Sequence, residues 1–229
     1  MGELAGATWT EVAAAPRRVL LLPLGSTEQH GPHLPLSTDT VIATRLAEDA
    51  RRQFPQTGLA PAVPYGASGE HAGFPGTLSI GTQALQALLV EFVRHAATDW
   101  EHVLVVNGHG GNAEALAGAA ALARYEGRSL VVHHAASGGP RADPHAGYRE
   151  TSLMLHLAPQ TVRLDRSAAG ATADLADLLP RITAGGVRAV SANGVLGDPS
   201  GATADDGRRI FAGMGSRLAQ QVRRLLTPS

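Results

Sequence analysis

The sequence predicts an α/β fold with a mainly parallel sheet, and three observations predict it. Short continuous apolar runs, typical of strands buried on both faces, occur at 18–24 (RVLLLPL) and 102–107 (HVLVVN). Longer segments between these runs carry apolar residues at helical spacing. Strands that alternate with helices indicate βαβ units with right-handed crossovers, and therefore parallel pairing.

In chain order, the first strand (18–24) is followed by a loop and by a predicted helix over 38–54. Thr38 or Asp39 is a plausible N-cap for this helix, because a short polar side chain there can accept a main-chain N–H. The run LAPAV (59–63) predicts a second short strand. A glycine-rich loop and a helix over 82–99 come next.

The strand over 102–107 runs directly into GHGGN (108–112) and an alanine-rich helix, which Asn112 can cap and Gly127 can end. SLVVHH (129–134) predicts a further strand, and a loop then leads to a helix from Tyr148 to Leu157. The segment 158–204 has few signals, and within it and just beyond, 185–206 is predicted as loop with a short strand. Residues 205–226 are predicted as an amphipathic helix. No repeat or linker divides the chain, so we expect one domain over residues 1–229.

The composition excludes several classes of function. The 229 residues are 44% apolar, enough for a sizeable core, and a net charge of -1 does not favour nucleic acid or anionic membranes. No apolar run approaches the ~18 residues of a membrane-spanning helix, and no signal segment begins the chain, so we expect a cytoplasmic protein. The chain has no cysteine, so any metal must be held by His, Asp and Glu.

The loop after the first strand, GSTEQHGPHLPLSTDT (25–40), concentrates two acids and two histidines. Prolines exclude a regular helix and glycines weaken a strand, so the segment is predicted to be a shaped loop. Charge clusters in such loops tend to be functional.

Three loops should meet at one edge of the sheet, because ligands bind beyond the carboxyl ends of parallel strands. These loops follow the strands at 18–24, 102–107 and 129–134, and they carry six candidate ligands: Glu28, His30, Asp39, His109, His145 and Glu150. Oxygen and imidazole ligands suit Zn²⁺, Mn²⁺ or Fe²⁺, and this many suit two ions about 3.5–4 Å apart. Metal-assisted hydrolysis by water is therefore the predicted chemistry.

Simpler interpretations exist for individual residues. Any one of these histidines alone could be a hydrogen-bonded structural residue, and GHGGN could cradle a phosphate, although the P-loop and dinucleotide patterns are absent. Of the other histidines, we interpret His95, His102 and His156 as structural, whereas either of His133 and His134 could face the site.

The quoted loop resembles the signature of the creatininase (creatinine amidohydrolase) family, G-S-x-E-Q-H-G-P-H-L-P-L-x-T-D. Further matches follow in family order at 65–81 (YGASGEHAGFPGTLSIG), 107–112 (NGHGGN) and 145–152 (HAGYRETS). The resemblance implies an αβα sandwich around a mainly parallel sheet. It also implies an amidohydrolase with two divalent metal ions per subunit (Zn and Fe or Mn) and a homo-oligomer.

The same resemblance implies roles for particular residues. Glu28 and His109 would bind one metal and His30 the other, with Asp39 bridging them. Creatininase has a further ligand, a Glu, two residues after the histidine that matches His109. In this chain that position is Gly111, and Glu150 is the available replacement.

Within the family, HAGYRETSLMLHL and the tail 185–211 resemble a subgroup of peptidases that act on a modified precursor peptide. That likeness implies release of a C-terminal Val–Tyr-derived unit from such a peptide. We expect His145 to pass a proton to the leaving nitrogen, Glu70 and His71 to line the substrate pocket, and His33 to hold its loop.

Two alternatives remain open at this point. One is a small-molecule amidohydrolase of the creatininase or formamide deformylase type, although Trp9 and Trp100 fall outside the matching loops, which disfavours creatinine. The other is a non-enzymatic sugar- or nucleotide-binding domain whose His/Asp cluster only stabilises loops.

Overall fold

A four-stranded, fully parallel sheet forms the centre of the computed structural model, which describes residues 3–135 and 143–227. The strand order is β2-β1-β3-β4. The strands are β1 (Val19–Leu24), β2 (Gly58–Leu59), β3 (His102–Asn107) and β4 (Leu130–His134). The predicted α/β fold with a parallel sheet is confirmed.

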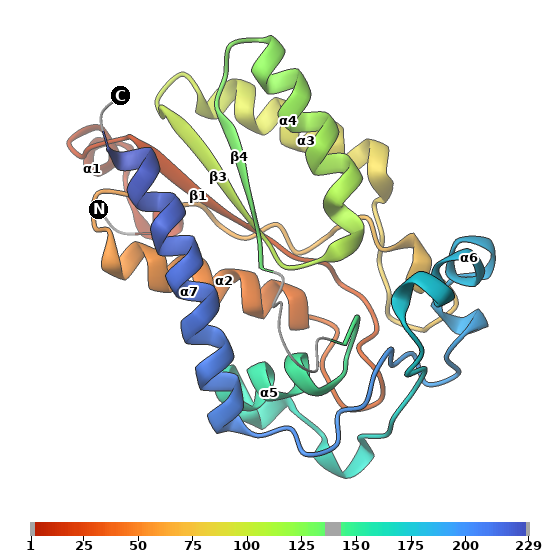
Figure 1. Cartoon of the computed structure of the whole chain (residues 1–229). Helices are drawn as coiled ribbons and strands as arrows, with labels where there is room; N and C mark the ends of the chain where they lie inside the picture. The colour runs from red at the N-terminus through yellow and green to blue at the C-terminus, as the bar shows by residue number, and fades with distance from the viewer. Residues whose placement is uncertain (1–2, 136–142, 228–229) are drawn as a thin grey trace.

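The described part of the chain contains seven α-helices: α1 (Trp9–Ala13), α2 (Thr38–Gln53), α3 (Gly81–Ala96), α4 (Ala113–Tyr125), α5 (Tyr148–Leu157), α6 (Leu175–Gly185) and α7 (Ala204–Leu226). Short 3₁₀ turns occur at Leu4–Gly6, Gly69–His71, Gly110–Asn112, Pro159–Thr161, Leu164–Arg166 and Val187–Ala189. Figure 1 shows α3 and α4 over one face of the sheet and α2 and α7 over the other. The arrangement is an αβα sandwich, as the family resemblance implied.

Alternate residues of the strands build two separate cores, as the period of two in a strand requires. On β1, Leu21 packs with Leu104 and with α2, α5 and α7. Its neighbour Leu22 packs with Val105 and with α3 and α4 on the other face. Both faces of the central strands are therefore buried, which explains why their sequences are continuous apolar runs.

Some predicted boundaries differ from the structure. The second strand has two residues rather than the expected 59–63. After the Ala60 N–H bonds to Leu21 O, the next donor toward β2 would be residue 23 of β1, and Pro23 has no N–H, although Val63 still bridges to Leu24. Helix α2 begins at Thr38, so Thr38 and Asp39 lie inside the helix, and no side chain caps it. The helix expected over 82–99 ends at Ala96.

Helix α6 was not predicted, because 158–204 has few local signals. Pro180 lies inside this helix, and a proline in a helix interior normally argues against one. The helix packs Leu178 against Val187 and Leu196 in a small third core. Tertiary packing therefore stabilises a segment whose local signals are weak.

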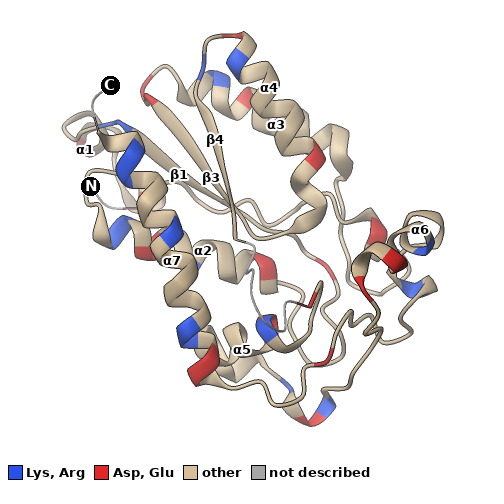
Figure 2. Cartoon of the chain, in the orientation of Figure 1, with Lys and Arg blue, Asp and Glu red and all other residues tan. Residues whose placement is uncertain are grey.

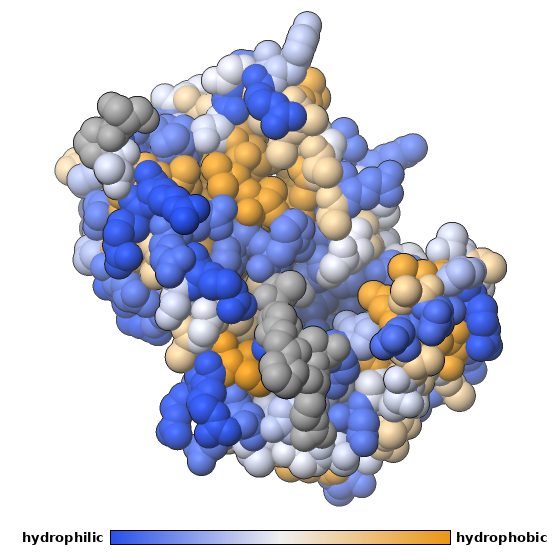
Figure 3. Space-filling model, in the orientation of Figure 1, coloured by the Kyte–Doolittle hydropathy of each residue, from blue (hydrophilic) through white to orange (hydrophobic). Residues whose placement is uncertain are grey.

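Charge and hydropathy are unevenly spread over the surface. Figure 2 shows acidic residues at the start of α7 and basic residues along the rest of it, and α7 itself begins with Asp205 and Asp206. Figure 3 shows apolar surface over β4, the edge strand, whose first three residues are half-buried.

None of the described helices is both long enough and apolar enough to span a membrane.

The strands end at the same level, and this positions the site. Leu24 pairs laterally with Asn107, and Asn107 pairs with His134. The loops that leave β1 and β3 therefore start side by side, as expected. Part of the predicted loop after β4 (136–142) lies outside the described residues.

The Asn112 side chain joins two of these loops to the strand ends. Its Oδ1 accepts the Ala67 N–H at 2.8 Å, and its Nδ2 donates to Gly25 O and to Asn107 Oδ1, each at 3.0 Å. Asn112 precedes α4, as predicted, but it does not cap the helix with its side chain.

We predict that Asn112→Ala lowers the free energy of unfolding by about 2–4 kcal/mol, because buried main-chain groups lose their partners. Urea unfolding followed by circular dichroism measures the change. Gln83→Ala, at an exposed position of α3, is the control and should leave the midpoint unchanged. Equal midpoints for both variants would show that the Asn112 hydrogen bonds do not stabilise the loops.

Candidate metal centre

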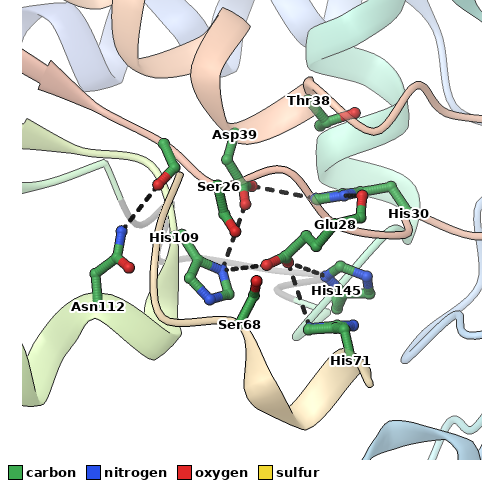
Figure 4. Close-up of polar contacts among 12 residues, drawn as sticks. Ser26, Glu28, His30, Thr38, Asp39, Ser68, His71, His109, Asn112 and His145 are labelled. Carbon is green, nitrogen blue, oxygen red and sulfur yellow. Dashed lines mark hydrogen bonds and ion pairs between the residues drawn. The ribbon is translucent and has the colours of Figure 1, made fainter. Parts of the chain in front are cut away.

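Acidic and histidine side chains from distant segments meet beyond the carboxyl ends of the strands (Figure 4). Glu28 and His30 come from the loop after β1, and Asp39 comes from the first turn of α2. His109 follows β3, and Glu150 lies in the first turn of α5. The six candidate ligands predicted from sequence, His145 included, thus lie in one cluster.

Asp39 is the central carboxylate, and its two oxygens face different histidines. Oδ1 lies 3.1 Å from His30 Nε2, and Oδ2 lies 3.3 Å from His109 Nδ1. The side chain is 2% exposed. One carboxylate between two imidazoles is the arrangement that a bridging ligand would have.

Glu28 is fully buried and also faces several histidines. Its Oε2 lies 3.1 Å from His109 Nδ1, and its Oε1 lies 3.3 Å from His71 Nε2 and 3.8 Å from His145 Nδ1. His71 is therefore a neighbour of the candidate ligands themselves.

Glu150 and His145 complete the side of the cluster next to His30. Glu150 Oε2 lies 3.7 Å from His30 Nε2 and accepts the Ala146 N–H at 2.6 Å. The rings of His30 and His145 are 4.3 Å apart between centroids.

The residues present fit divalent metal ions. Both carboxylate oxygens of Glu28 and Oδ2 of Asp39 are buried without a hydrogen-bond partner among the described residues, and a buried bare carboxylate is costly unless a cation is near. Ligand atoms within 4.8 Å of one another form three groups: Glu28–Asp39–His109, His30–His145–Glu150 and Glu28–His71–His145. The first two groups share no residue, as a pair of separate ion sites would require.

Electrostatics also favours positive charge in the cluster. Burial alone would lower the pKa of His30, but the carboxylates of Asp39, Glu150 and Glu28 raise it to about 10. Burial alone would also lower the pKa of His109, but hydrogen bonds to Asp39 and Glu28 raise it well above its usual value. Burial raises the pKa of Glu150 to about 7, although His30 opposes this. The carboxylates therefore stabilise cations, whether protons on imidazoles or metal ions.

His145 and His71 behave differently from His30 and His109. Burial and the nearby His30 and His71 lower the pKa of His145 well below its usual value. Burial also lowers the pKa of His71. These two rings are therefore neutral, while His30 and His109 attract positive charge.

Glu70 occupies the space beside Gly111. Its Oε1 lies 3.3 Å from His109 Nε2, on the opposite side of the ring from Glu28 and Asp39. A Cβ at Gly111 would lie 2.5 Å from Glu70 Oε1 and 2.4 Å from Ala67 O. A longer side chain at position 111, such as the Glu of creatininase, has no room while Glu70 is there.

A cavity of about 280 Å³ adjoins the cluster, and its lining includes His109, Glu150, Arg149, His134 and Leu153. Glu70 and His71, expected to line the substrate pocket, are not part of this lining. The sequence predicted that either His133 or His134 could face the site. In the structure, His134 borders the cavity.

Two further histidines make contacts outside the cluster. His133 Nδ1 lies 2.8 Å from Gln221 Oε1 on α7. His33 Nε2 pairs with Thr151 Oγ1 at 2.8 Å, as expected for a residue that holds its loop, and burial with the neighbouring His30 lowers the pKa of His33 to about 4. The three histidines interpreted as structural belong to none of the metal-like groups found among the described residues.

Sequence reasoning missed Gln29, which lies between Glu28 and His30 and is buried. Its side-chain nitrogen lies 2.8 Å from His71 Nδ1 and 3.0 Å from His145 Nε2. The available signal was its place inside the ligand-bearing loop, but an uncharged amide carries no metal-ligand signature. Two buried hydroxyls, Ser26 and Ser68, also lie at the cluster (Figure 4).

The chain is similar in sequence to proteins of one known family. The family model described as Creatininase: Creatinine amidohydrolase matches residues 5–222. The mycofactocin precursor peptide peptidase of Mycolicibacterium smegmatis is 53% identical over 211 residues, covering 90% of this chain and 85% of that protein. A protein of the same name from Mycobacterium tuberculosis (strain H37Rv) is 50% identical, covering 98% of this chain and 92% of its own.

Solved structures agree. A manganese creatininase has a TM-score of 0.81 and 26% identity, covering 98% of each chain. A mutant creatininase of the Zn–Zn type has a TM-score of 0.82 and 26% identity, covering 100% of each chain. The chain therefore belongs to the creatininase family of amidohydrolases.

Proposed function

We propose that this protein hydrolyses an amide bond near the C-terminus of a modified precursor peptide and releases a Val–Tyr-derived unit. The peptidases at 50–53% identity, named for the mycofactocin precursor peptide, support this substrate. Water supplies the oxygen that bonds to the carbonyl carbon, the C–N bond breaks, and the leaving nitrogen gains a proton.

The observation that carries the proposal is the position of Asp39 between His30 and His109, at 3.1 and 3.3 Å. We assign Glu28, His109 and Asp39 to one divalent ion and His30, Asp39 and Glu150 to a second, with Zn²⁺ and Fe²⁺ or Mn²⁺ as candidates. Such ions, when bound, would polarise the scissile carbonyl and make a water molecule more acidic.

His145 is positioned to move the proton. Its Nε2 lies 2.9 Å from Gln29 O, which only accepts hydrogen bonds, and 3.0 Å from Gln29 Nε2, whose two hydrogens have Gly194 O and His71 Nδ1 as acceptors. We therefore place the hydrogen of the His145 ring on Nε2. Its Nδ1 then faces the cluster with a free lone pair and can take a proton from water and deliver it to nitrogen. Glu150 lies near this ring, and both side chains are neighbours of His30.

The adjoining cavity is the proposed place for the substrate. Its lining mixes the apolar Leu153 and Ile42 with the polar Asn107, His134 and Arg149, which suits a peptide with both amide and apolar parts. Neither tryptophan reaches this place: Trp9 is 81% exposed and Trp100 is buried in the core against α3. An aromatic creatinine pocket built from tryptophan is therefore absent from the described residues.

We predict that the metal-loaded protein hydrolyses the modified precursor peptide with a kcat/KM at least about a hundredfold above that for creatinine or a formamidopyrimidine. Liquid chromatography with mass spectrometry of all three reactions tests this. Faster turnover of creatinine would assign a small-molecule amidohydrolase instead. If none of the three compounds is hydrolysed, with or without added metal, a non-enzymatic binding domain would be favoured.

Replacing the central carboxylate should abolish metal binding. We predict that Asp39→Ala loses both ions and about 4 kcal/mol of transition-state stabilisation, about a thousandfold in turnover. Emission spectroscopy measures the metal, and circular dichroism should show an unchanged fold. Asp49→Ala on the same helix, where the carboxylate pairs with Arg52, is the matched control. An active Asp39→Ala variant with full metal content would contradict the assignment.

Glu150 tests the second ion separately. We predict that Glu150→Gln lowers the stoichiometry from about two zinc ions to about one, because a neutral amide is a poor replacement for a carboxylate ligand. Isothermal titration with zinc measures this, with the exposed Glu114→Gln on α4 as control. Unchanged affinity for both ions would show that Glu150 is not a ligand.

A further inference from the structure

The amide of Gln29 has a fixed orientation between two histidines of the cluster. Its Oε1 accepts the Gly31 N–H at 2.8 Å, and a main-chain N–H can pair only with the oxygen end. Its Nε2 lies 3.0 Å from Gly194 O, a pure acceptor, which requires the same orientation. A Cβ at Gly194 would lie 2.0 Å from Gln29 Oε1, so glycine there leaves room for the amide.

The two hydrogens of this amide nitrogen have three candidate acceptors: Gly194 O, His71 Nδ1 and His145 Nε2. His71 Nδ1 can only accept from this amide nitrogen, whereas His145 Nε2 has a second partner, the main-chain Gln29 O at 2.9 Å, to which it can donate. One hydrogen therefore goes to Gly194 O and the other to His71 Nδ1, 2.8 Å away.

This assignment determines the form of His71. A ring nitrogen that accepts a hydrogen bond carries no hydrogen, so the hydrogen of the neutral ring is on Nε2. His71 Nε2 lies 3.3 Å from Glu28 Oε1 and 3.9 Å from Glu70 Oε1. The side of the His71 ring that faces these carboxylates therefore carries an N–H and not a lone pair, although its geometry to Glu28 Oε1 is not that of a hydrogen bond.

The other histidines of the cluster have the opposite arrangement when neutral. His30 Nδ1 lies 3.2 Å from Glu28 O, and His109 Nε2 lies 3.2 Å from Ala67 O, so these nitrogens carry the hydrogens. Their other nitrogens face Asp39 with lone pairs, as a metal ligand must. His145 likewise presents Nδ1.

We infer that Gln29 is a positioning residue that holds His71 in its Nε2–H form, so that His71 is a hydrogen-bond donor at the centre and not a metal ligand. The group Glu28–His71–His145 is then not a third ion site, although its ligand atoms lie within 4.8 Å. In the proposed hydrolysis, on which this last step rests, the His71 N–H would stabilise negative charge that develops on the substrate oxygen.

Nitrogen-15 NMR of histidine-labelled protein tests the inference without any activity measurement. Two-bond correlations distinguish protonated from unprotonated ring nitrogens, and loss of a signal set in His71→Gln assigns His71. We expect His71 to show a protonated Nε2 both before and after saturation with zinc, while the signals of His30 and His109 change. A protonated Nδ1 on His71, or a zinc-induced change typical of a coordinated Nε2, would overturn the inference.

Gln29→Glu tests the cause, since a carboxylate cannot donate to His71 Nδ1. We expect the His71 hydrogen to move to Nδ1, while His145 is unchanged because its partner is the main-chain oxygen of residue 29. Zinc stoichiometry should stay the same, and kcat on the precursor peptide should fall about 10–100-fold, the range for losing a residue that orients a functional histidine. Gln83→Glu on the surface of α3 is the control.

The outcomes separate this inference from the proposed function. If wild-type protein does not hydrolyse the peptide but His71 has a protonated Nε2, the proposed substrate fails and the role of Gln29 stands. If Gln29→Glu leaves the His71 spectrum unchanged, the role of Gln29 fails whatever the substrate is. Should Gln29→Glu not fold, the wild-type spectra alone still decide the form of His71.

Discussion

The site depends on one interaction, the buried carboxylate of Asp39 between the imidazoles of His30 and His109. A carboxylate so deeply buried is costly unless positive charge compensates it, and the two rings provide that charge as protons or hold it as metal ions. His30 and His109 come from loops that follow different strands. The same contact therefore links loop structure, charge balance and the proposed chemistry.

The backbone is built to allow this contact. Parallel strands of matched register bring the loops after β1 and β3 to one level, and glycines let the segments approach closely. A Cβ at Gly108 would lie 2.4 Å from Asp39 O, and one at Gly25 would lie 2.2 Å from Thr40 Oγ1. Helix α2 can thus begin directly against both loops, with Asp39 in its first turn.

Much of this could be predicted from sequence, because buried strands and functional loops have strong local signals. The bounds of β3 and of α5 agree with those predicted, and the six candidate ligands lie together. The sequence did not predict helix α6, because Pro180 argues against a helix. The packing of Leu178 in the small third core stabilises the helix, and that packing is not visible in the local sequence. It also could not relate Gly111 to Glu70, since these residues are 41 positions apart and meet only through the fold.

The position of Gln29 explains why a cluster so rich in histidine need not bind metal at every ring. Four imidazoles around carboxylates are chemically similar, and what distinguishes them is the partner on the far side of each ring. Main-chain oxygens stand behind His30, His109 and His145, so each of these rings turns a lone pair inward. An N–H donor behind a ring reverses this. The amide nitrogen of Gln29 lies 2.8 Å from His71 Nδ1, and although it also lies 3.0 Å from His145 Nε2, that nitrogen has the main-chain Gln29 O as its acceptor.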